Sequence, residues 1–226
     1  MKCTSYGECV EQYNQEISRL WKLEFDNAIK STENTSVKFK QFCFHVKQDE
    51  SPIWFFGMNP SLLDSTNEYI SRTTPPDKHL FEKLEEEQKY MHTEIQYFQR
   101  ATDFFEEEVK IPELRKPIFH DLYPVRHTNQ KEFVKFLEDN DDFCNSFDTA
   151  TKNLIDGIMP DIIVIANAKA SKLMQKIFFG RNKENKHEFE GITKLTYELD
   201  GKKTDMIFSS MLSGQRALDT YSRSRL

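Results

Sequence analysis

The sequence predicts an α/β protein, organised as a three-layer α/β/α sandwich around a central, mainly parallel four-stranded sheet. Two observations predict this class. Short apolar runs alternate along the chain with longer amphipathic segments, and residues 161–166 form a β-branched run that a helical pattern follows directly. The 226 residues, of which 38% are hydrophobic, are enough for one core, and their number also allows two small domains. Of these two arrangements we expect a single domain over residues 1–226.

The N-terminal half of the chain predicts a helix, two strands and a charged helical segment. Hydrophobic residues recur mostly at intervals of three and four along residues 8–30, as on an amphipathic helix. Residues 37–46 alternate and then become more apolar, and Pro52 introduces a second strand over residues 53–57. Residues 77–108 predict one or two acidic helices, in which neighbouring glutamates point to different sides and favour a solvated face over a metal site.

The C-terminal half predicts alternating strands and helices. The expected elements are a strand at residues 118–124, two helices between residues 131 and 158, a strand at 161–166, a helix at 168–179, strands at 193–199 and 203–209, and a helix at 216–226. Asp200-Gly201, between the last two strands, is a strong hairpin signal. In such a fold the ligand crevice is expected beyond the C-terminal ends of the parallel strands.

Composition limits the partners and the location that we expect. The net charge of −6 provides no overall basic field, so any contact with DNA must be local. No hydrophobic run approaches the roughly 20 residues that span a bilayer, and the N-terminus lacks the apolar segment of a signal peptide. These features predict no membrane association and a cytoplasmic location, with the nucleoid or nucleus as the host requires. Cys3, Cys9, Cys43 and Cys144 form no CxxC pair, which favours reduced thiols over a disulfide or a zinc site.

Polar residues follow the expected strand ends. They lie in Gly57-Met-Asn-Pro-Ser61, His120-Asp-Leu-Tyr-Pro-Val-Arg126, Ala166-Asn-Ala-Lys169 and Ser209-Ser-Met-Leu-Ser-Gly-Gln-Arg216. Because ligands of open α/β sheets bind outside the carboxyl ends of the strands, we expect these residues to converge on one site.

These motifs resemble those of the uracil-DNA glycosylase superfamily, especially its thymine-DNA and mismatch-specific uracil glycosylase branch. Gly57-Met-Asn-Pro-Ser61 is similar to the family's first motif, Gly-Ile/Met-Asn-Pro-Gly, and Met211-Leu-Ser-Gly-Gln-Arg216 is similar to its second. Residues 118–128 and 161–169 are similar to the strands and loops between these motifs. The resemblance runs over about residues 53–226, and the N-terminal helix and the acidic segment fall outside it or match poorly.

The resemblance implies a DNA glycosylase-like hydrolase. Such an enzyme cleaves the N-glycosidic bond of a uracil-type, mismatched or modified base by water attack, after the base has been flipped out of the stack. Asn59 would position the water, and stabilisation of the departing base anion would supply much of the rate. The implied residues are Asn59 and His120 for catalysis; Phe56, Gly57, Met58, Tyr69, Asp121 and Asn167 for base binding; and Arg126, Ser209, Ser210, Ser213, Gly214 and Arg216 for DNA binding. No metal and no organic cofactor is expected.

The sequence departs from the family pattern at two places. Asp121 accepts hydrogen bonds from an exocyclic amine, as cytosine or adenine offers, whereas a uracil reader more often uses an amide. Met211-Leu212 stands where relatives often carry His or Asn followed by Pro, so the usual electrostatic helper is absent unless His120 or Arg216 replaces it. The alternative function is therefore a catalytically inactive module of the same fold that binds nucleic acid or a nucleotide. A third is an interaction protein whose acidic helices contact a protein partner.

The site residues also have purely structural interpretations, which the sequence leaves open. Asn-Pro after a strand is a common turn, and Asp121 can cap a turn. His120 fits a satisfied, partly buried histidine, and the serines of the second motif can cap the last helix. Arg126 and Arg216 fit ordinary surface charges.

Overall fold

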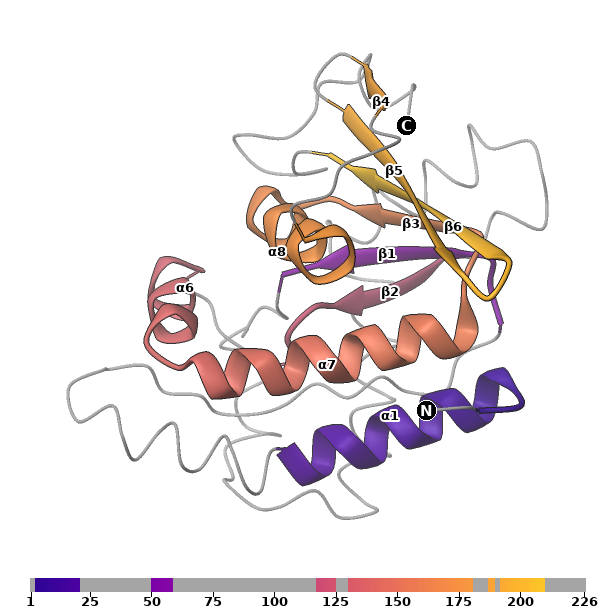
Figure 1. The fold of residues 1–226 in the computed structure, drawn as a ribbon. Helices are drawn as coiled ribbons and strands as arrows, with labels where there is room; N and C mark the ends of the chain where they lie inside the picture. Colours follow the sequence, from indigo (N-terminus) through magenta and orange to yellow (C-terminus); the bar gives the residue numbers. More distant parts are fainter. Residues whose placement is uncertain are drawn as a thin grey trace, which may run out of the picture. The chain divides into compact units, whose positions relative to one another are not determined.

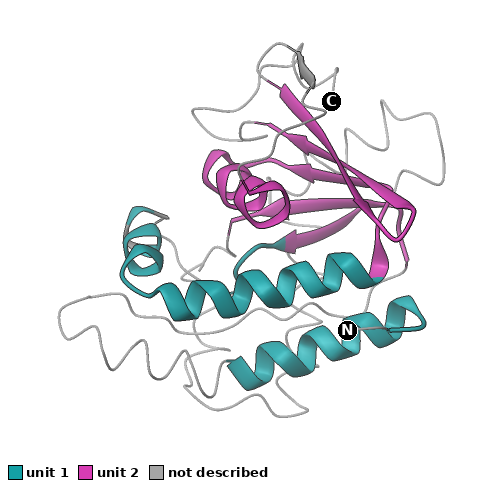
Figure 2. Ribbon diagram, viewed as in Figure 1, with its two compact units in different colours: residues 1–47, 59–85, 121–157 teal, residues 48–58, 86–120, 158–226 magenta. Residues whose placement is uncertain are grey.

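The computed structural model describes residues 3–20, 50–58, 117–124, 130–180, 187–189 and 192–209. The chain forms two compact units, each assembled from several segments (Figure 2). Unit 1 comprises residues 1–47, 59–85 and 121–157, and unit 2 comprises residues 48–58, 86–120 and 158–226. The single domain expected over residues 1–226 stays a prediction.

Within the residues that the structure describes, unit 2 is organised around a six-stranded sheet (Figure 1). Its strands are β1 (Ile53–Gly57), β2 (Ile118–Asp121), β3 (Ile162–Ile165), β4 (His187–Phe189), β5 (Ile192–Leu199) and β6 (Lys202–Phe208), in the order β2-β1-β3-β6-β5-β4. Strands β1, β3 and β6 are parallel, with Phe56 opposite Ile165 and Ile165 opposite Phe208. The mixed α/β fold class and the parallel centre of the sheet are therefore confirmed.

The expected count of four strands is wrong, because antiparallel strands extend the sheet beyond β6. Strand β5 pairs with β6 across the turn at Asp200 and Gly201, whose φ angles of 50° and 80° are those that a twisted two-residue hairpin needs. Strand β4 then pairs with β5 and forms the outer strand. With only three residues, β4 is too short to show a strand pattern in the sequence.

Strand β1 is covered on both faces. Its first four residues, Ile53, Trp54, Phe55 and Phe56, are all buried, although neighbouring residues of a strand point to opposite faces. A continuous apolar run of this kind is typical of a strand inside a parallel sheet. The strand expected at residues 53–57 is therefore confirmed.

Helix α8 (Ala168–Phe179) packs against the sheet within unit 2. Its buried residues include Ala170, Met174 and Phe178, which recur every four positions and form one apolar face. Phe178 and Phe179 meet Tyr197 of β5 edge-on, with ring centroids 4.9 and 6.2 Å apart. The helix occupies the residues that the sequence predicts.

Unit 1 is helical in the part that the structure describes. It contains α1 (Tyr6–Leu20), α6 (Gln130–Glu138) and most of α7 (Asp141–Ile158). Aromatic rings hold α6 to α7. The ring of Phe136 in α6 meets that of Phe143 in α7 edge-on, with centroids 5.2 Å apart, and within α7 the ring centroids of Phe143 and Phe147 are 4.6 Å apart. The two helices expected between residues 131 and 158 are thus confirmed.

A buried tyrosine joins α7 to the segment after β2. Tyr123 is fully buried, and its hydroxyl donates to Oδ1 of Asp148 at 2.9 Å. Burial and the neighbouring negative charge of Asp148 both raise the pKa of Tyr123, so the hydroxyl keeps its proton. The donor that Asp148 needs is therefore present over the whole physiological range.

The expectation of reduced cysteines is wrong for two of the four. Cys3 and Cys9 form a disulfide, with Cα atoms 5.3 Å apart. The two cysteines come together because the residues before α1 fold back against its first turns. CxxC spacing in the sequence does not indicate such a contact. The added Cβ of an alanine at Gly157 of α7 would lie 2.6 Å from Sγ of Cys3 and 2.9 Å from Sγ of Cys9. The bridge therefore lies against α7 at a position where only glycine leaves room.

Several predicted elements lie outside the described residues. They are the strand at residues 37–46, the acidic helices at 77–108, the C-terminal helix at 216–226 and the part of the first helix beyond Leu20. The first helix is confirmed from Tyr6 to Leu20. Within the described ranges, no helix has the length and apolar character that crossing a membrane requires.

The start of α1 is expected to loosen in acid. Oε2 of Glu8 accepts hydrogen bonds from the Thr4 hydroxyl and the Thr4 amide, both at 2.7 Å, and these bonds lower the pKa of Glu8. Because the folded pKa is below the ordinary value of 4.5, the bonds contribute fully above that value and are lost as the pH falls through the lowered pKa.

Hydrogen exchange at the Thr4 amide checks this prediction. We expect protection to fall below pH 4.5 in the native protein, and a Glu8→Gln variant to show no such pH dependence. A native profile as flat as that of Glu8→Gln would contradict the prediction.

Candidate functional site

The parallel register of unit 2 brings three strand ends to one edge of the sheet. The amide of Ala166 donates to the Phe56 carbonyl at 3.3 Å, and the amide of Ser209 donates to the Ile165 carbonyl at 3.0 Å. Gly57, the last residue of β1, therefore lies level with Ala166 and Ser209, the first residues after β3 and β6. Ligands of open α/β sheets bind at such an edge, so it is the candidate functional site.

His120 of β2 stacks with aromatic side chains of the adjacent strand β1. Its ring centroid is 5.1 Å from that of Phe56, at an interplanar angle of 16°, and 4.5 Å from that of Trp54. Only 8% of the residue is exposed. The structure therefore places the imidazole inside the sheet packing of unit 2, next to the strand that leads to the first motif.

Asp121 takes a different direction from His120. The two residues are adjacent in β2, and adjacent strand residues point to opposite faces. By its contacts Asp121 belongs to unit 1, where its charge helps raise the pKa of Tyr13, after the larger effect of burial. The structure thus does not bring His120 and Asp121 together on one face.

Asn167 uses its side chain to begin α8. Oδ1 accepts from the amides of Lys169 at 2.9 Å and Ala170 at 3.1 Å, which satisfies two donors of the first turn. The residue itself is extended, with φ −150° and ψ 127°, as an N-cap residue is. Because Oδ1 is engaged by the helix, the predicted base-binding role of Asn167 would fall to its side-chain nitrogen Nδ2.

Asn167→Ala is expected to lower the free energy of unfolding by about 1 kcal/mol, because two amides of α8 lose their acceptor. Urea unfolding measures the loss. Asn167→Ser is the matched control, since a serine hydroxyl can still cap the helix. Equal stability of the alanine variant and the native protein would contradict the capping role.

Ser209 carries a buried hydroxyl at the end of β6. The residue is 5% exposed, and Oγ has no hydrogen-bond partner within the part of the chain that the structure describes. A buried hydroxyl without a partner loses free energy relative to water, so a partner for this group is expected. Of the predicted DNA-binding residues, Ser209 is the one that the structure describes.

Sequence reasoning missed Ser171, which lies beside the same edge. Its hydroxyl is buried in the first turn of α8 and lies 3.4 Å from the Ile165 carbonyl and 3.5 Å from the Ser209 carbonyl. The signal was present in the sequence. Asn167 and Ser171 are four residues apart and so share a helix face, and a small polar residue on the inward face is unusual in an otherwise apolar row.

The remaining predicted residues divide into two groups. Phe56 and Met58 are buried, at 1% and 3% exposure, so their side chains contribute to packing, while Gly57 is partly exposed. The others lie outside the described residues: Asn59, Tyr69, Arg126, Ser210, Ser213, Gly214 and Arg216. The structure therefore brings together Gly57, Asn167 and Ser209 near one edge, with His120 on the strand beside β1.

Comparison with protein families and with curated proteins finds no match to this chain.

A metal site needs several suitable side chains close together. Among the residues with described positions, no three His, Cys, Asp or Glu side chains are grouped so that they could hold a metal ion. The groups that the edge does offer are hydroxyls, an amide and backbone groups, which bind polar ligands through hydrogen bonds.

Proposed function

We propose that this chain is a DNA glycosylase-like hydrolase that removes a uracil-type, mismatched or modified base by water attack, in a three-layer α/β/α fold of the uracil-DNA glycosylase type. The aligned ends of β1, β3 and β6 carry this proposal. They are the edge at which such a fold binds its ligand, and the three sequence motifs follow them. Burial of both faces of β1 and the packing of α8 support the layered architecture.

The proposed reaction assigns each motif one task. Asn59, two residues after β1, orients the water that attacks the sugar carbon. His120 stabilises the negative charge that develops on the departing nucleobase. This stabilisation supplies much of the rate, because an asparagine is a weak general base for activating the water. Ser209 and the residues after it contact the DNA backbone, where hydroxyls bind phosphate oxygens.

Two observations favour a second candidate, a binding module of the same fold without catalysis. His120 is packed against Trp54 and Phe56, and the acceptor atom of Asn167 is engaged by the helix. Both groups would then serve the fold, and the edge would retain only the means to bind nucleic acid or a nucleotide.

Release of the base from defined oligonucleotides tests the proposal. The full chain is incubated with single- and double-stranded oligonucleotides carrying uracil, mismatched thymine or modified cytosines, and alkali-labile abasic sites are counted. Asn59→Ala is expected to abolish release. Asn145→Ala, the same exchange at an exposed position of α7, is the matched control and should act as the native chain does.

The outcomes separate the candidates. Release that Asn59→Ala abolishes and Asn145→Ala preserves supports the glycosylase. Binding to DNA that weakens steeply with salt, without release from any substrate, supports the binding module. Absence of both release and binding rejects the two candidates together and favours an interaction protein that contacts its partner through the acidic helices.

A further inference from the structure

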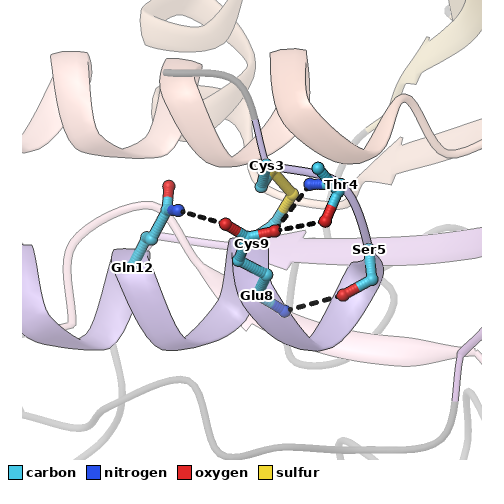
Figure 3. The surroundings of a disulfide bond; sticks show 6 residues. All are labelled: Cys3, Thr4, Ser5, Glu8, Cys9 and Gln12. Atoms are coloured by element: carbon cyan, nitrogen blue, oxygen red, sulfur yellow. Dashed lines mark hydrogen bonds between the residues drawn. A yellow bond between two sulfur atoms is a disulfide. The ribbon is translucent and has the colours of Figure 1, made fainter.

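The disulfide of unit 1 lies at the start of α1 (Figure 3). Cys3 lies before α1 and is partly exposed, whereas Cys9 lies in the first helical turns and is 4% exposed. Both line a small pocket with Gln12 and Glu16 of α1 and Asn153 of α7. Cys3 is therefore the more accessible residue of the pair, and Cys9 is almost fully buried.

We propose that Cys3 and Cys9 form a reversible thiol–disulfide exchange site for low-molecular-weight thiols, with Cys3 as the attacked sulfur and Cys9 as the resolving thiol. In the reductive direction a thiolate of the small thiol attacks Sγ of Cys3, the bond between the two sulfurs breaks, and Cys9 leaves as a thiolate. A second small thiol attacks the mixed disulfide on Cys3. The small thiols leave as their own disulfide, and their two protons end on Cys3 and Cys9.

The position of Cys9 suits it to be the leaving group. Its amide donates to the Ser5 carbonyl at 3.1 Å, so it lies where the helix begins. The beginning of a helix stabilises a thiolate, and a better leaving thiolate speeds exchange. In the oxidative direction the same thiolate attacks a mixed disulfide on Cys3, whose Cα lies only 5.3 Å from that of Cys9.

The surroundings let the bridge open without loss of the helix. The Glu8 carboxylate holds Thr4 through two hydrogen bonds, and the Glu8 amide donates to the Ser5 hydroxyl at 3.3 Å (Figure 3). This cap does not involve either sulfur. The bridge also closes a short segment, with a sequence separation of six, and short loops gain the least stability from a disulfide.

Gly157 provides a specific test of the closed state. An alanine Cβ there would lie within 3 Å of both sulfurs, at 2.6 and 2.9 Å. Two thiols can rotate away from such an atom, but two bonded sulfurs cannot do so independently. Gly157→Ala should therefore disfavour the disulfide relative to the dithiol. An overpacking cost of about 1.4 kcal/mol, within the usual range, lowers the equilibrium constant for disulfide formation about tenfold.

The experiment equilibrates the full chain with mixtures of reduced and oxidised glutathione, quenches the reaction with acid and maps all four cysteines by alkylation and mass spectrometry. We expect the Cys3–Cys9 pair to pass from dithiol to disulfide within this range. Cys9→Ser should accumulate glutathione on Cys3, and Cys3→Ser should accumulate far less on Cys9. Cys144→Ser is the control and should leave the exchange at Cys3 and Cys9 unchanged, because Cys144 lies in α7 with its thiol donating to the Leu137 carbonyl at 3.1 Å.

Two further measurements keep the result independent of folding defects. Gly157→Ala should need about tenfold more oxidising glutathione mixtures, whereas Thr149→Ala, on an exposed position of α7, should behave as the native chain does. Reduction should lower the Tm of the native chain by roughly 4–8 °C and leave the Tm of Cys3→Ser unchanged. A pair that stays bonded, or stays reduced, in every mixture overturns the proposal, and so does equal modification of Cys3 and Cys9 in the two serine variants.

Discussion

Replacement of Trp54 by alanine is expected to lower the free energy of unfolding by about 3–5 kcal/mol, the usual loss for a large aromatic residue removed from a core. Trp54 is fully buried in β1, and its ring lies 4.5 Å from that of His120 and 6.2 Å from that of Phe56. Its indole N–H also donates to the Ser51 carbonyl at 3.2 Å, so the truncation leaves a cavity and removes a donor from a buried segment.

Urea unfolding followed by circular dichroism measures this loss without relying on the tryptophan signal. Trp54→Phe is the matched variant. It keeps an aromatic ring and removes the N–H, so its loss should be smaller than that of Trp54→Ala. Lys203→Ala removes an exposed ion pair with Glu198, in which the side chains are 67% and 55% exposed, and should leave the midpoint nearly unchanged. Equal losses for Trp54→Ala and Lys203→Ala would contradict the central position of Trp54.

His120→Phe is expected to reduce base release by about 100-fold or more while the protein stays folded, if the proposed function holds. Phenylalanine is a flat ring of similar size, so the stack with Phe56 and Trp54 is retained and the free energy of unfolding should change by less than about 1.5 kcal/mol. The hydrogen-bonding groups of the imidazole are removed. The variant therefore separates the chemistry of His120 from its packing.

The comparison needs both release and stability from the same preparations. His120→Ala is the control for packing, because it removes the ring together with the hydrogen-bonding groups and should lose stability as well as activity. Unchanged release in His120→Phe would show that the ring serves only the stack. Unchanged release in Asn59→Ala as well would reject the proposed catalytic roles of both residues.

Local patterns predicted the central fold correctly because each of its elements has a signal of its own. The apolar run at Ile53–Gly57, the β-branched run at Ile162–Ile165 and the Asp200-Gly201 turn each specify a structure within a few residues. Strand β4 has no such signal, since it exists by pairing with β5. The strand count failed because both β5 and β4 join the same sheet as antiparallel strands, and the disulfide was missed because it depends on the fold of the chain before α1.

The candidate site could be located from the sequence but not described from it. The order of strands and helices predicts which edge carries Gly57, Asn167 and Ser209, because parallel strands end together. It does not predict that Asn167 faces the amides of α8, nor that His120 and Asp121 point to opposite faces of β2. Side-chain direction depends on register and capping, which are properties of the folded chain.

The hydroxyl of Ser171 has a mechanical consequence for unit 2. It lies near the last carbonyl of β3 and the carbonyl of Ser209, while the amide of Ser209 donates to that same β3 carbonyl. A rotation of α8 would therefore displace the ends of β3 and β6 together. A ligand that binds the end of β6 would in turn restrict the motion of the first turn of α8. The edge and α8 should respond as one rigid body, so a ligand bound there should slow hydrogen exchange in α8 as well as in β6.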